Sequence, residues 1–147
     1  MLVASRATGE LVDTTFRKLP EFVAPGDLLV VNTSATVPAA VGTDDGRVVH
    51  FSTELPDGDG TRWVVELRRP CGAGSLPDAT AQPGDRVELD GGGALDLVSR
   101  FPEDGPPRLW VAAPHLQVPV IDYLARRGLP IRYGCTELSW PIDAYQT

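Results

Sequence analysis

The chain has 147 residues with 13 basic and 20 acidic side chains, a net charge of -7. Its length suits one domain or two small lobes, and its 42% content of hydrophobic residues excludes an intrinsically disordered chain. It has neither an apolar run of the ~18 residues that a membrane span needs nor a basic-then-apolar leader, so we expect a cytoplasmic protein with reduced thiols and no membrane association.

The first third of the chain predicts a hairpin, a helical turn and a buried strand. Apolar runs on either side of a Thr-Gly-Glu turn predict the hairpin over residues 2–12, and apolar spacing broken by a proline predicts a short helix over 16–22. Pro25-Gly26-Asp27 is a turn signal. The four apolar residues Leu28–Val31 then predict a strand buried on both faces, which ends in Asn32-Thr33-Ser34.

Short strand-like runs separated by turn residues fill the middle of the chain. Apolar and polar residues alternate within these runs, as in Trp63, Val65 and Leu67. The pattern predicts a small antiparallel β-barrel. The turn-rich stretch Pro70–Pro77 predicts a loop. The predicted strands are Arg47–Thr53, Arg62–Leu67, Arg86–Leu89, Ala94–Val98 and Arg108–Ala112.

The last part predicts one helix and an irregular tail. Apolar residues between 118 and 125 fit a helix stopped by Gly128 and Pro130. The fold class that follows is mostly β with some α: a β-barrel over 42–118, inserted into the start of an α/β domain made of 1–41 and 119–147. Because no stop signal ends the sequence, we also expect the chain to be truncated.

Metal and nucleophile chemistry have weak sequence support. Neither His50 nor His115 has a metal ligand at a suitable spacing, and no cysteine lies next to a histidine. Gly91-Gly92-Gly93 lacks the Lys-Ser/Thr of a phosphate-binding loop and predicts a hairpin turn. The sequence therefore predicts no metal, and it leaves the catalytic residue unknown.

Two clusters of polar residues are candidate binding sites. Asn32-Thr33-Ser34 offers small hydrogen-bonding groups for ribose hydroxyls or a carboxylate; the alternative is a polar exit from a strand. Arg126, Arg127 and Arg132 beside Tyr133 offer a clamp for a phosphate backbone and a surface on which a base can stack; the alternative is cationic capping of a helix end. A pI near 4.7 argues against non-specific nucleic-acid binding but leaves a local basic groove open.

The order of motifs along the chain resembles one family, the S-adenosylmethionine:tRNA ribosyltransferase-isomerases of queuosine biosynthesis. The resemblance runs from residue 2 to residue 147. The motifs that carry it, in order, are Thr8-Gly9-Glu10 with Phe16, Pro25–Asn32 with Pro38-Ala39, Pro83-Gly84-Asp85, Gly128–Tyr133 and Tyr145-Gln146-Thr147.

The resemblance implies an α/β domain interrupted by a β-barrel, and a reaction on tRNA. In that reaction the ribosyl part of S-adenosylmethionine is transferred to a 7-aminomethyl-7-deazaguanine base and isomerised, with release of adenine and methionine. The implied partners are tRNA and S-adenosylmethionine. The substrate-binding residues would be Asn32, Thr33, Ser34, Arg132, Tyr133, Tyr145 and Gln146, and the nucleic-acid contacts Arg126, Arg127 and Arg132.

The sequence departs from the family's pattern at four positions. Ala35 and Ala40 stand where the family has arginines, Val49 where a glutamate is usual, and Arg132 where a second proline is usual. Alanine cannot replace a guanidinium that clamps an anion. Two alternatives therefore stay open: a divergent relative with another substrate, and a β-barrel binding module without chemistry of its own. The oligomeric state is not predicted.

Overall fold

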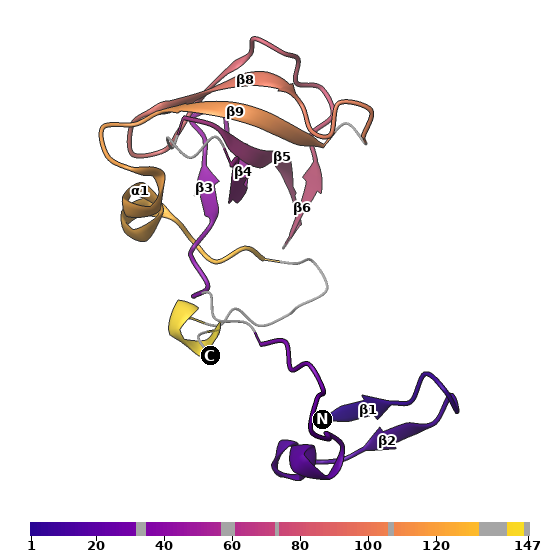
Figure 1. Ribbon diagram of the computed structural model, residues 1–147. Coiled ribbons are helices and arrows are strands. Elements are labelled where there is room, and N and C mark those ends of the chain that lie inside the picture. Colours follow the sequence, from indigo (N-terminus) through magenta and orange to yellow (C-terminus); the bar gives the residue numbers. More distant parts are fainter. Residues whose placement is uncertain (32–34, 57–60, 73, 106–107, 133–140, 146–147) are drawn as a thin grey trace. The chain divides into compact units, whose positions relative to one another are not determined.

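The computed structural model describes residues 1–31, 35–56, 61–72, 74–105, 108–132 and 141–145. They form two compact units, Met1–Ser34 and Ala35–Thr147, which we describe separately. Strands outnumber helices, which confirms the predicted mostly-β fold class with some α (Figure 1). Among the described helices, none is long and apolar enough to cross a membrane.

The first unit contains the predicted hairpin and helical turn. Strand β1 (Leu2–Ala4) pairs antiparallel with β2 (Leu11–Asp13). The amino group of Met1 donates a hydrogen bond to the carbonyl of Thr14 at 2.6 Å, which ties the open end of the hairpin together. The 3-10 helix η1 (Phe16–Glu21) follows directly. Both sequence predictions for residues 2–22 are confirmed.

The buried strand predicted over Leu28–Val31 is wrong. The preceding turn forms as expected, since the Asp27 carboxylate accepts a hydrogen bond from the amide of Ala24 at 2.7 Å. Residues 28–31, however, are not a strand, and their exposed fractions lie between 61% and 87%. A strand is buried only where neighbouring strands accept its backbone bonds and other elements cover its side chains. None of the described residues of this unit is buried, so the unit offers no such cover.

The second unit is built on one antiparallel sheet. Its strands follow the order β3-β4-β5-β9-β8-β7, with β6 paired to β5 outside that path. Four of the five predicted strands match to within a few residues. The fifth, β5, runs further than expected, so the predicted loop over 70–77 contains the end of β5 and all of β6. The bounds are β3 (Ala40–Gly42), β4 (Val48–Glu54), β5 (Trp63–Cys71), β6 (Gly74–Pro77), β7 (Arg86–Glu88), β8 (Ala94–Arg100) and β9 (Leu109–His115).

The sheet is curled (Figure 1), and backbone contacts join its two edge strands. Just beyond β3 and β7, Thr43 and Leu89 form an antiparallel bridge. The amide of Asp44 donates to the carbonyl of Glu88 at 3.2 Å, and the amide of Asp90 donates to the carbonyl of Gly42 at 2.9 Å. These contacts join the first and last strands of the sheet, as expected of the small barrel that the sequence predicts.

Side chains that alternate along the strands fill the inside of the curled sheet. The Trp63, Val65 and Leu67 alternation points inward as predicted, and each of these side chains is at most 6% exposed. Phe51 packs edge-to-face on Trp63, with ring centroids 5.9 Å apart. The guanidinium of Arg100 lies 4.5 Å from the ring centroid of Trp110, which is fully buried. The core therefore rests on aromatic side chains from adjacent strands.

The predicted helix packs at one end of this core, beside β3 (Figure 1). Helix α1 (Val120–Arg127) buries Val120, Tyr123 and Leu124 in the core. The Tyr123 hydroxyl donates to the carbonyl of Asp90 at 2.8 Å, which fixes the helix to the turn between β7 and β8. The helix ends at Gly128, as predicted, and a second 3-10 helix, η2 (Ile142–Tyr145), is described later in the chain.

The chain segments before β4 and after α1 meet in space. The amide of Ala40 donates to the carbonyl of Leu129 at 2.9 Å, and the amide of Leu129 donates back at 2.8 Å. Gly128 makes this approach possible, because a Cβ there would overlap the carbonyl oxygen of Pro38. Residues 38–40, before the barrel, and residues 128–129, after it, therefore lie side by side. The division into a barrel over 42–118 and an α/β part made of 1–41 and 119–147 stays a prediction.

A buried carboxylate supports the turn after β6. Asp78 is 1% exposed and accepts hydrogen bonds from the amide and hydroxyl of Thr80 at 3.0 and 2.7 Å. Burial raises the pKa of Asp78, but these bonds and the guanidiniums of Arg47 and Arg69 outweigh it, so that the net pKa is lowered. Asp78 is thus an ionised, fully bonded group with a structural role.

A candidate anion-binding cavity

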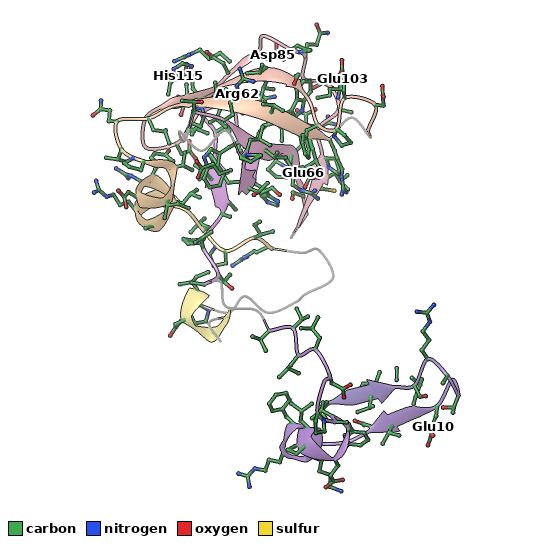
Figure 2. All side chains as sticks on the ribbon, in the orientation of Figure 1. Glu10, Arg62, Glu66, Asp85, Glu103 and His115 are labelled. Carbon is green, nitrogen blue, oxygen red and sulfur yellow. The ribbon has the colours of Figure 1, made fainter. Side chains whose placement is uncertain are left out.

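One row of residues crosses the outer face of the sheet, on the side away from the core. Cross-strand pairing places Ala40 opposite His50, His50 opposite Glu66, and Glu66 opposite Leu109. Directly opposed residues share a face, and the neighbouring row of Val41, Val49 and Leu67 points into the core. In Figure 2, Glu66 of β5 and His115, the last residue of β9, lie in different parts of the sheet. The row therefore presents polar groups where the sheet faces outward.

A cavity of about 310 Å³ lies over this row. The strands β4, β5 and β9 provide its floor, and the segment that follows α1 reaches it because Leu129 pairs with Ala40. It is lined by His50, Phe51, Ser52, Glu66, Arg68, Arg108, Leu109, Ile131 and Arg132. Three guanidiniums against one carboxylate make this lining positive, in a chain whose net charge is -7. The acidic composition did not exclude a local basic site, and this cavity is such a site.

One of the three arginines is held in place by the sheet itself. Arg68 donates from Nη1 to the carboxylate of Glu66 at 2.6 Å, and from Nε and Nη2 to the hydroxyl and carbonyl of Ser75 at 2.8 and 2.5 Å. Both members of the Arg68–Glu66 pair are less than a fifth exposed. Glu66 is the only carboxylate among the described residues that line the cavity, and because Arg68 neutralises it, it repels an incoming anion little.

The other two arginines are available to a ligand. Arg108, next to the first residue of β9, and Arg132, beyond α1, are both exposed. Neither forms an ion pair with any residue that the structure describes. A guanidinium presents a planar fork of donors that matches the oxygens of a phosphate or carboxylate. Two such forks at one cavity form an arrangement suited to an oxyanion.

His50 lies in the same cavity as a neutral imidazole. Partial burial lowers its pKa, the nearby charge of Arg68 lowers it further, and the Glu66 carboxylate raises it by less. The net pKa of His50 is below its usual value, so the ring is uncharged at neutral pH and can donate or accept a hydrogen bond.

We expect His50 to make the free energy of unfolding depend on pH. Its pKa is lower in the folded chain than in the unfolded chain, so the unfolded chain binds the proton more tightly. This contribution to stability is complete above the unfolded value of about 6.5 and declines as pH falls from there through the folded pKa. Urea denaturation of the wild type and of His50→Gln at several pH values measures it, and the variant should lose less stability on acidification.

The matched control is His115→Gln, which changes the other histidine of the chain. It should keep the part of the pH dependence that His50 provides. Identical pH profiles for the wild type and His50→Gln would contradict this account of the imidazole.

The structure separates the arginines that the sequence groups together. Arg132 lines the cavity, whereas Arg126 and Arg127 are exposed in the last turn of α1, and Arg127 lies beside the turn at Gly91. Tyr145 is the last residue of η2. The other predicted binding residues, Asn32, Thr33, Ser34, Tyr133 and Gln146, lie outside the described residues, so their roles stay predictions.

Sequence reasoning missed the other polar residues of the cavity. The predicted alternation of Trp63, Val65 and Leu67 agrees with an outward Glu66 between the last two, but nothing in the sequence says that β4, β5 and β9 are neighbours. The structure locates two of the residues that depart from the family's pattern. Val49 is 1% exposed in the core, and Ala40 lies opposite His50 in the pairing of β3 with β4. Among the described residues no three potential metal ligands come together, and the absence of a metal stays a prediction.

Comparison with known proteins gives one consistent result. The profile of a family described as "Queuosine biosynthesis protein" matches residues 1–147. Three similar proteins are named S-adenosylmethionine:tRNA ribosyltransferase-isomerase. Those of Acidiphilium cryptum (strain JF-5), Geobacter metallireducens (strain ATCC 53774 / DSM 7210 / GS-15) and Solibacter usitatus (strain Ellin6076) are 35%, 32% and 31% identical over 96, 107 and 120 residues.

These matches cover 63%, 71% and 68% of the chain and 25%, 29% and 32% of the relatives. The chain thus spans about a quarter to a third of the length of the curated relatives that it matches. No solved structure matches it.

Proposed function

The chain belongs to the family of queuosine biosynthesis proteins, and we propose that it is part of an enzyme that modifies tRNA. The enzyme takes the ribosyl part of S-adenosylmethionine and attaches it, with isomerisation, to the amine of 7-aminomethyl-7-deazaguanine in tRNA. The products are epoxyqueuosine in tRNA, adenine and methionine. The observation that carries this proposal is the family match over every residue of the chain.

The chemistry of the reaction sets what the protein has to supply. The positive sulfonium of S-adenosylmethionine acidifies the neighbouring 5′ carbon, so a positioned base removes a proton there. The amine of the tRNA base must also be held close to the ribose, which is a matter of orientation. The described residues support the orientation of the tRNA. The sheet forms a platform, and the cavity over it carries the positive charge that attracts RNA phosphates.

An assay with defined products tests the proposal. The 147-residue chain and, in parallel, the complete gene product are incubated with S-adenosylmethionine and tRNA that carries 7-aminomethyl-7-deazaguanine. Adenine is measured by chromatography and the modified nucleoside by mass spectrometry. We expect the complete product to form adenine and modified nucleoside in equal amounts.

The control is the same tRNA with guanine at the target position, which has no aminomethyl group to accept the ribosyl unit. The proposal fails if the folded complete product releases no adenine above this control. Adenine release without modified nucleoside would also count against it, because hydrolysis of the cofactor is a different reaction.

A further inference from the structure

We propose that the cavity over β4, β5 and β9 binds a backbone phosphate of tRNA through Arg108 and Arg132. The identity of the nucleic acid rests on the proposed function; the preference for a phosphate rests on the cavity alone. The two arginines come from segments that are far apart in sequence, and both line one space of about 310 Å³. Since neither is paired with a described carboxylate, their charge is open to a ligand.

The remaining groups of the cavity fit the same ligand. Arg68 is held by Glu66 and Ser75, so it cancels the charge of Glu66 and fixes the floor of the cavity. His50, neutral at pH 7, and the exposed Ser52 offer hydrogen bonds without a negative charge. The aliphatic side chains of Leu109 and Ile131 line the same space and suit the carbon atoms of a ribose.

The charge of the cavity distinguishes between the two substrates of the proposed reaction. S-adenosylmethionine has a carboxylate, but it also has a sulfonium and an ammonium group, so its net charge is positive. The unpaired guanidiniums of Arg108 and Arg132 leave the cavity with an excess of positive charge, which disfavours such a ligand. An RNA phosphate is negative and brings no cation. The geometry therefore favours tRNA over S-adenosylmethionine at this position.

The assignment also distinguishes between the arginines of the chain. Arg126 and Arg127 lie in the last turn of α1, where cationic side chains interact favourably with the helix dipole whether or not RNA is present. They line no part of the cavity. Exposed charge of this kind contributes to RNA affinity only through long-range attraction, which salt screens.

A binding experiment on the 147-residue chain tests the proposal. The affinity for fluorescently labelled tRNA is measured by anisotropy over a series of salt concentrations for the wild type, Arg108→Gln, Arg132→Gln and the double variant. Each single change should weaken binding about tenfold at low salt. The double variant should also reduce the slope of log affinity against log salt by roughly 0.7 to 0.9, the value of one phosphate contact.

Two matched variants serve as controls. Arg126→Gln removes an exposed arginine of the same unit, and Arg17→Gln removes one from the first unit. Both should change the affinity by less than about threefold and keep the slope, because neither removes a contact. Circular dichroism verifies that each variant is folded. Equal losses in Arg126→Gln and Arg132→Gln would overturn the assignment, as would a double variant that binds like the wild type.

A second measurement identifies the ligand group directly. Inorganic phosphate and S-adenosylmethionine are titrated separately into isotopically labelled chain, and amide and side-chain resonances are followed. Phosphate should shift the signals of Arg108, Arg132 and His50. Shifts of the same signals by S-adenosylmethionine alone would assign the cavity to that substrate and refute the proposal.

The outcomes are independent of those of the enzyme assay. A complete product that modifies tRNA equally well with and without Arg108 and Arg132 would leave the proposed function standing and remove this inference. Phosphate and tRNA binding that depend on both arginines, in a protein that releases no adenine, would do the reverse.

Discussion

Replacing Trp110 by alanine is expected to lower the free energy of unfolding by about 4 kcal/mol, the typical cost of deleting a buried aromatic side chain. The ring is fully buried on β9 opposite Val65, and Arg100 stacks on it at 4.5 Å. Its removal leaves a cavity in the middle of the sheet and takes away the surface on which that guanidinium rests. Urea denaturation followed by circular dichroism measures the loss.

The control is Trp110→Phe. No described residue accepts a hydrogen bond from the buried Nε1 of Trp110, so phenylalanine removes a donor that contributes little and keeps most of the apolar area. The expected cost is below about 1.5 kcal/mol. A loss as large as that of alanine would show that the indole N–H has an essential partner and that the packing argument is incomplete.

Replacing Gly128 by alanine is expected to cost about 2 to 3 kcal/mol. The added Cβ would overlap the carbonyl oxygen of Pro38 and lie 2.6 Å from that of Leu124. Both are backbone atoms, so the two segments have to move apart. The movement should break the pairing of Ala40 with Leu129 and displace Arg132 from the cavity, which resonance shifts of Arg132 and denaturation together detect.

The matched control is Leu129→Ala, one residue further on. Leu129 is 66% exposed and is held by backbone hydrogen bonds that alanine keeps, so its stability should change by no more than about 0.5 kcal/mol. Gly128→Ala with wild-type stability and an unmoved Arg132 would show that the chain absorbs the clash elsewhere.

The two Pro-Gly-Asp turns show how far the sequence predicts this fold. In both, the aspartate accepts a hydrogen bond from the amide three residues before it, Ala24 in the first and Gln82 in the second. The second turn leads into β7, which pairs with β8, while the first leads into the exposed residues 28–31. Turn chemistry is local and can be seen in sequence. Whether a partner strand is present depends on tertiary contacts, which the turn residues do not encode.

The same limit applies to the candidate site. The outward position of Glu66 follows from a period of two, and the arginine at 132 stands out beside an aromatic residue. The cavity itself depends on β5 pairing with β9, more than forty residues later in the chain, and on the pairing of Ala40 with Leu129. Such long-range neighbours are fixed by the closure of the sheet. The sequence therefore predicts single contributors to the site and not their assembly.

The reciprocal backbone hydrogen bonds between Ala40 and Leu129 bring together the two ends of the segment that runs between these residues. The polypeptide enters and leaves at adjacent points, and the strands and helix between them share one core, to which Ala39 and Ile131 add from just outside the pair. A unit whose two ends are adjacent in this way can be inserted between two neighbouring backbone positions of another domain without forcing those positions apart.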